Sequence, residues 1–224
     1  RPTFPARSSH VPGRRELQGR LLVTPQAKAC ENAMKAKAPG QSSLLLVDVI
    51  AVLNGRHIPY AIIGAFAGSF HGVVRASLDA DAMISLASGE ADVNALLDDL
   101  RKAGFKSVYR RGDAGDPVGA VMKVEDRFKN RVDLLMNIQG VTREAFSRAI
   151  EADFMGARIR VVGVEDFIAM KILAGGPKDL SDVAGVLKVS DNQINRRLLK
   201  GLVEKYGRRA SAHLESLLKG SSGD

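Results

Sequence analysis

The chain has a single cysteine, Cys30, among its 224 residues, and it has no long hydrophobic run. One cysteine excludes an internal disulfide, which fits a reducing compartment. No stretch reaches the roughly 18 uninterrupted apolar residues of a transmembrane helix. The best candidate, residues 43–53, is short and carries Asp48. No signal peptide is evident, so we expect a cytoplasmic protein without a membrane partner.

Positive charge is concentrated at the two ends of the chain. Residues 1–40 carry eight Lys and Arg against Glu16 and Glu31, which accounts for +6 of the net charge of +8. A second cluster near the C-terminus has two interpretations, a polyanion partner or a solvated face. Its members are Arg196, Arg197, Lys200, Lys205, Arg208 and Arg209.

The hydrophobic pattern predicts an α+β protein with a mixed β-sheet, flanking helices and a mostly helical C-terminal region. Residues 1–40 are rich in Pro, Arg and Ser and read as a flexible arm, with a short helix expected over 24–37. Residues 41–140 are expected to form the core. Residues 141–224 are expected to be mostly helical, with a helix over 142–151 and a strand over 157–162, and to complete the active site.

The most informative stretch is YAIIGAFAGSFHGVVRASLDADAMISL, residues 60–86. It predicts a strand, a glycine turn, a short helix and then a strand that begins at Asp-x-Asp. Side chains alternate along a strand, so Asp79 and Asp81 are expected on one face. Two like charges there favour a cation between them, and oxygen ligands suit Mg²⁺. A surface loop is the alternative for an isolated Asp-x-Asp.

Two further features fit the same site. Gly64 follows one strand and precedes a helix, where backbone N–H groups can approach a phosphate, although a tight packing turn explains it as well. Asp133 lies in the apolar strand 131–138, on the face opposite Val132 and Leu134. An isolated acid there needs a partner, either a metal ion or a nearby base such as Arg131.

A third group of candidates follows in the helical region. Lys171 lies within an apolar helix, so its ammonium either reaches water or meets an anion. Lys178, Asp179 and Asp182 begin the next helix, where acids can also serve as simple helix caps.

Together these segments resemble the nucleotidyltransferase superfamily with the DNA polymerase beta-like core, in its minimal, toxin-like branch. The pattern reads Gly64-Ala65, His71-Gly72 and then Arg75-Ala76-Ser77-Leu78-Asp79-Ala80-Asp81. Lys171 and Lys178-Asp179-x-x-Asp182 are similar to downstream motifs of the abortive-infection (AbiEii-type) toxins. Ala65 stands where the pattern has Gly or Ser, so a hydroxyl contact to phosphate is absent there.

The resemblance implies a catalytic and metal-binding set of Asp79, Asp81 and Asp133, holding two Mg²⁺ ions with Mn²⁺ as a substitute. Asp133 would be a metal ligand, a general base or both. It also implies an NTP donor held by Gly64, Ala65, Arg75 and Lys171.

Four hypotheses remain for the activity. The acceptor is RNA, such as a tRNA end in a toxin-type role with a cognate antitoxin, and is held partly by Arg196 and Arg197. Alternatively it is a protein hydroxyl, or a small molecule such as an aminoglycoside. The fourth hypothesis is an inactive binding module, against which the complete set of three acids argues.

Overall fold

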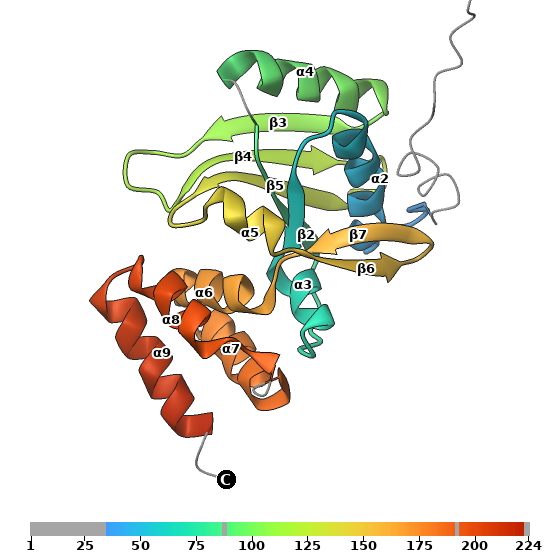
Figure 1. Ribbon diagram of the computed structural model, residues 1–224. Helices are drawn as coiled ribbons and strands as arrows, with labels where there is room; N and C mark the ends of the chain where they lie inside the picture. Colours follow the sequence, from blue (N-terminus) through green and yellow to red (C-terminus); the bar gives the residue numbers. More distant parts are fainter. Residues whose placement is uncertain (1–34, 87–88, 191–192, 222–224) are drawn as a thin grey trace, which may run out of the picture.

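The computed structural model describes residues 35–86, 89–190 and 193–221. Its centre is a seven-stranded mixed sheet with the strand order β3-β4-β5-β2-β1-β7-β6 (Figure 1). The two parallel pairs are β2 with β5 and β1 with β7. The strands are β1 (Tyr60–Ile63), β2 (Asp79–Ile84), β3 (Lys106–Arg111), β4 (Val118–Glu125), β5 (Arg131–Ile138), β6 (Ile150–Phe154) and β7 (Ala157–Val161).

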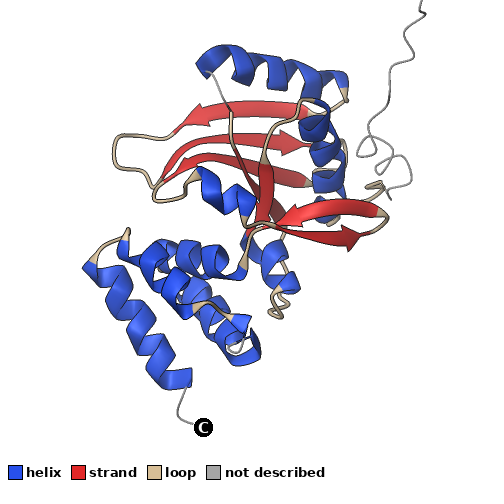
Figure 2. Cartoon of the chain, in the orientation of Figure 1, coloured by secondary structure: helices blue, strands red, loops and turns tan. Residues whose placement is uncertain are grey.

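Helices lie on the sheet and in a separate cluster beside it (Figure 2). They are α2 (Ser42–Gly55), α3 (Gly64–Phe70), α4 (Gly89–Lys102), α5 (Arg143–Ser147), α6 (Val164–Ala174), α7 (Pro177–Ser190), α8 (Arg196–Glu204) and α9 (Arg208–Ser221). The last four form the cluster. The predicted α+β class, with a mixed sheet and flanking helices, is confirmed.

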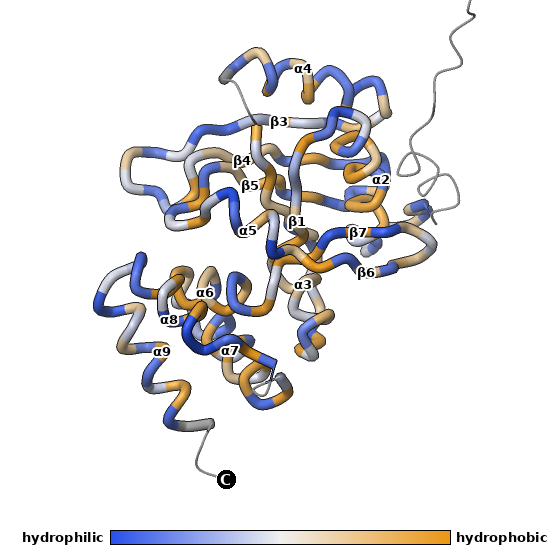
Figure 3. Tube along the Cα trace, in the orientation of Figure 1, coloured by the Kyte–Doolittle hydropathy of each residue, from blue (hydrophilic) through white to orange (hydrophobic). Residues whose placement is uncertain are grey.

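Helix α2 forms because residues 44–53 are almost continuously apolar, and it buries them against the sheet. Leu45, Leu46 and Ile50 are fully buried, and Figure 3 shows the hydrophobic colour along this helix. Small Ala80 and Ala82 lie in the sheet core. Val132 and Leu134 of β5 are fully buried as well, which leaves the alternate residues of β2 and β5 for the opposite face.

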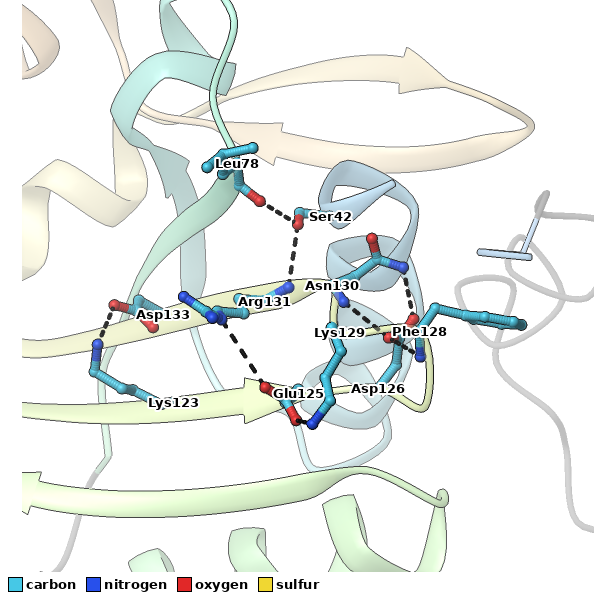
Figure 4. Close-up of polar contacts among 10 residues, drawn as sticks. All are labelled: Ser42, Leu78, Lys123, Glu125, Asp126, Phe128, Lys129, Asn130, Arg131 and Asp133. Carbon is cyan, nitrogen blue, oxygen red and sulfur yellow. Dashed lines mark hydrogen bonds and ion pairs between the residues drawn. The ribbon is translucent and has the colours of Figure 1, made fainter. Parts of the chain in front are cut away.

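Ser42 ties the beginnings of β2 and β5 together. Its hydroxyl donates to the Leu78 carbonyl oxygen at 2.6 Å and accepts from the Arg131 backbone N–H at 3.1 Å (Figure 4). β2 begins at Asp79, the first acid of the Asp-x-Asp motif, and Asp79 stands opposite Arg131 in the ladder. Both acids of the Asp-x-Asp motif therefore belong to the strand.

The sequence prediction was wrong in one segment of the C-terminal region. The helix expected over 142–151 ends at Ser147, and residues 150–154 form β6, which pairs with β7. The turn between them is Met155-Gly156, both with positive φ, which matches the twist that a two-residue hairpin requires.

Two further expectations concern the N-terminal region and membrane insertion. Residues 1–34, with most of the expected arm and of the helix over 24–37, lie outside the described residues, while 35–37 are not helical. In the part that the structure describes, no helix is long and apolar enough to cross a membrane.

Candidate active site

Three carboxylates share one face at the centre of the sheet. Asp79 and Asp81 alternate with buried Ala80 on β2, and Asp133 is the ladder partner of Asp81 on the parallel strand β5. Neighbouring strands lie about 4.8 Å apart, and residues paired in register point to the same side. The structure thus brings together the three acids that the sequence singled out, although they are separated by about fifty residues of chain.

The electrostatics of Asp81 reflect this crowding. Burial is the main cause that raises its pKa to about 6, and the carboxylates of Asp133 and Asp79 contribute to the rise. Lys171 and Arg75 oppose it, since their positive charges favour the ionised form. Asp81 is therefore a partly buried acid at which negative charge exceeds the local compensation.

Gly64 lies against Asp81 and leaves room for its carboxylate. Its φ is +67°, and a Cβ added there would overlap Asp81 Oδ2. Both the backbone conformation and the close approach require glycine. The glycine turn predicted from the sequence is therefore a structural requirement of the acidic site itself. Ala65, the next residue, is buried in α3.

A pocket of about 260 Å³ opens beside Asp81, between the sheet and α6. Most of its lining side chains are apolar, and the charged ones are Asp81, Lys171 and Asp179. The apolar contributors from the sheet side are Pro117, Val118, Leu135 and Ile138, and those from α6 include Phe167, Met170 and Leu173.

Lys171 is held by two acids. Its Nζ lies 2.7 Å from Asp179 Oδ1 and 2.9 Å from Asp182 Oδ2. Asp182 also accepts from Arg75 Nε at 3.1 Å, so this acid joins the two cations next to Asp81. The side chains of Lys171 and Asp182 are 11% and 6% exposed. From the sequence, the Lys171 ammonium was expected either to reach water or to meet an anion. In this structure it meets two anions, Asp179 and Asp182. Lys178 is exposed on α7.

Lys123 is a site residue that sequence reasoning missed. Its Nζ lies 3.3 Å from Asp133 Oδ2 (Figure 4), whereas the base proposed from the sequence, Arg131, approaches Glu125. The sequence carries a signal for it, because residues 118–124 and 131–138 are two apolar runs that form a hairpin around the polar turn 125–130. Lys123 and Asp133 are equally far from the middle of its turn, and they are ladder partners in β4 and β5.

The donor set suits a hard divalent cation, although it is not preassembled. Among residues 35–86, 89–190 and 193–221, no three acidic, histidine or cysteine side chains converge into a metal centre. Asp133 instead faces Lys123, which supplies positive charge beside it. Carboxylate oxygens from Asp79, Asp81 and Asp133 are nevertheless the ligands that Mg²⁺ prefers, and a cation would relieve the crowding of charge at Asp81.

Arg196 and Arg197 lie apart from this acidic face. They line a groove between α8 and α9 with Lys200, Lys219 and others, and none of the groove residues lines the pocket at Asp81. The structure does not bring the two arginines to the carboxylates.

The fold is shared with solved nucleotidyltransferases. The antibiotic-resistance factor ANT(2'')-Ia matches with a TM-score of 0.51 and 16% identity, over 80% of this chain and 97% of that one. A nucleotidyltransferase-like protein from Paracoccidioides brasiliensis matches with a TM-score of 0.44 and 19% identity, over 82% and 95%. Lincosamide adenylyltransferase LnuA gives 0.43 and 9%, over 69% and 99%. A comparison with curated protein sequences finds no match.

At the level of sequence, residues 44–219 match the family described as "Nucleotidyl transferase of unknown function (DUF2204)". This range includes the three acids, the glycine turn and the Lys171 network. The comparisons do not place the chain in the abortive-infection toxin branch. The chain belongs to the DUF2204 family and is a nucleotidyltransferase.

Proposed function

We propose that this protein transfers a nucleoside monophosphate from an NTP to a hydroxyl group of its acceptor, using Asp79, Asp81 and Asp133. The observation that carries the proposal is the pairing of Asp81 with Asp133 on parallel strands, with Asp79 on the same face. Phosphoryl-type transfer depends mainly on positioning and electrostatics, so few side chains need to do chemistry.

The three carboxylates would hold divalent metal, proposed as two Mg²⁺ ions with Mn²⁺ as a substitute. When bound, the metal lowers the pKa of the attacking hydroxyl and stabilises the leaving pyrophosphate. Asp133 would serve as a ligand, or as the base for the hydroxyl, in competition with Lys123, which contacts its Oδ2. The cation would also compensate the charge that raises the pKa of Asp81.

The donor is proposed to lie in the pocket between the sheet and α6. Its apolar walls suit the faces of a nucleobase, while its charged end at Asp81 and Lys171 suits the phosphates. The turn at Gly64 and Ala65 would approach the triphosphate, and Lys171 and Arg75 would neutralise it. Asp179 has a quarter of its side chain exposed, so it is the partner that Lys171 can exchange for phosphate.

The acceptor is proposed to be RNA, because the part of the chain that follows α7 is strongly basic and contains the groove between α8 and α9. The proposal extends to a toxin-type role with a cognate antitoxin. Its support is the resemblance of residues 75–81 and 178–182 to the abortive-infection toxins.

A small-molecule acceptor is the second candidate. The observation that favours it is the fold shared with ANT(2'')-Ia, whose whole chain is nearly covered. A structure of that protein contains adenylyl-2''-tobramycin. A fold of this size can therefore bind a small acceptor as well as the nucleotide.

The test is a transfer assay with α-labelled NTPs, Mg²⁺ and three acceptor sources: total RNA, a lysate depleted of nucleic acid, and an aminoglycoside panel. We expect label on RNA, and none with Asp81→Asn. The matched control Asp98→Asn removes an exposed acid on α4 and should leave transfer unchanged. Label on a polypeptide or on a drug would replace the RNA proposal. NTP binding without transfer to any acceptor would overturn the enzymatic assignment.

A further inference from the structure

The two last helices carry most of the net charge of the described chain. Residues 193–221 contain seven Lys and Arg against Glu204 and Glu215, whereas residues 35–190 contain 20 Lys and Arg against 19 acids. All seven of these cations are exposed. Positive charge is thus gathered on one structural unit, the α8–α9 pair, and the rest is nearly neutral.

Five of these cations line two hollows on either side of α8. One hollow of about 1060 Å³ lies between α8 and α9 and includes Arg197, Lys200 and Lys219. A second hollow of about 480 Å³ lies between α5 and α8 and includes Arg197 and Lys205. The two hollows share Arg197 and Gly201, so they adjoin at α8, and we call the surface that carries both of them the track.

The packing of α8 leaves its basic side exposed to solvent. Leu199 and Val203 are fully buried and Leu202 is nearly so, which fixes the apolar side of the helix against the cluster. Arg197, Lys200 and Lys205 project from the other sides. In the part of the chain that the structure describes, these three make no ion pair within 4.0 Å. Exposed cations that are not held in close ion pairs can neutralise phosphates and release counterions, although Glu204 and Glu215 also line the larger hollow.

From these observations we propose that the track across α8, formed by Arg197, Lys200, Lys205 and Lys219, is the docking surface for single-stranded RNA. That RNA binds to this surface does not depend on the proposed transfer function. That the bound RNA is the acceptor of the nucleotide rests on it. α6 lies between the track and the donor pocket, since it packs against α8 and also lines that pocket. A helix is roughly 10 Å across, and a flexible single-stranded end can span that thickness to reach Asp81.

The test compares two triple variants by fluorescence anisotropy with a labelled single-stranded RNA of mixed sequence. Arg197→Ala/Lys200→Ala/Lys205→Ala removes three charges from the track. The control Arg101→Ala/Lys102→Ala/Lys106→Ala removes three exposed charges near β3. Each phosphate contact to a single strand contributes about −0.7 to the log–log salt slope, so the track variant should lose about 2 from it. We expect at least tenfold weaker binding at low salt, with the control unchanged.

Both variants are measured in the Asp81→Asn background, so the outcome does not depend on chemistry. Binding to the track without any transfer by the wild type would leave this proposal standing and overturn the proposed function. Equal affinity and equal salt slope in the two triple variants would overturn the docking surface. Vesicles with anionic lipid serve as a second probe, and binding to them but not to RNA would also overturn it. Thermal unfolding of each variant confirms the fold.

Discussion

Asp81 on β2 and Asp133 on β5 are direct ladder partners in a parallel strand pair, and their carboxylates share one face of the sheet. The backbone hydrogen bonds of the sheet therefore fix the spacing of two like charges. Ser42 reinforces this alignment because its hydroxyl forms hydrogen bonds with the backbone where both strands begin.

The first prediction concerns pH and stability. Asp81 has a pKa of about 6 in the folded protein against 3.8 for an ordinary aspartate. The folded state binds this proton more tightly, so its free energy of unfolding falls as pH rises from about 4 to about 6. The loss at pH 7 is at most about 3 kcal/mol. Asp81→Asn should remove this pH dependence and raise stability at pH 7 without metal.

Chemical denaturation of wild type and Asp81→Asn at pH 4 and pH 7 measures this effect, with Asp98→Asn as the control. Mg²⁺ should stabilise the wild type and not the variant, because it binds only the folded acidic site. An Asp81→Asn protein that is less stable than wild type at pH 7 would contradict a raised pKa of Asp81.

The second prediction concerns Gly64. Gly64→Ala places a Cβ on the Asp81 carboxylate and also strains a backbone with φ of +67°. Gly104 has φ of +90° but open space around its missing Cβ. Gly104→Ala should therefore cost only the backbone strain, about 1 kcal/mol, whereas Gly64→Ala should cost more and reduce kcat at least about tenfold through a displaced Asp81. Equal kcat in the two variants would show that the close approach is irrelevant to activity.

The third prediction concerns Lys171. Lys171→Met leaves Asp182 buried with Arg75 as its remaining partner, so we expect a loss of roughly 3 kcal/mol of stability. The double variant Lys171→Met/Asp182→Asn removes the stranded charge and should recover part of that stability. NTP binding, measured by calorimetry, should stay weak in both variants. If the double variant binds NTP as wild type does, Lys171 has a structural role alone.

The fourth prediction concerns Lys123. Its ammonium faces Asp133 at 3.3 Å, so it competes with a divalent cation for that carboxylate. A unit charge at this separation near water is worth about 1 kcal/mol. Lys123→Met should therefore raise the apparent Mg²⁺ affinity roughly fivefold in a titration followed by thermal shift. Lys129→Met, which removes a lysine paired with Glu125 on the same hairpin, is the control and should leave it unchanged.

Much of the acidic site was predictable because strands impose simple rules. The alternation of Asp79 and Asp81 around Ala80, and of Asp133 between Val132 and Leu134, predicted which side each acid faces. That these faces belong to neighbouring strands was not predictable from alternation, because β2 and β5 are far apart in sequence and their pairing depends on tertiary packing. The resemblance, rather than the pattern, suggested that the three acids meet.

Other parts required the structure for different reasons. Lys171 has two acidic partners because α7 turns back at Gly175, and a local pattern does not show that contact. The strand β6 was missed although its five residues, 150–154, alternate apolar and polar side chains, because the run is short and its first two residues also continue the helical pattern of 142–151. The basic cluster in α8 and α9 was predictable from the Lys and Arg content of that segment, but the groove between the two helices was not.

The β2–β5 ladder also bears on how the protein acquires its activity during folding. Pairings between distant segments, and parallel ones above all, form slowly because closing the intervening loop costs entropy before the new contacts stabilise it. α4, β3 and β4 all lie between the two acids in the chain. We therefore expect the carboxylates to become neighbours in a late step, and that step brings like charges together. A divalent ion in solution would favour this step, so a cation bound as proposed would also favour the maturation of the protein.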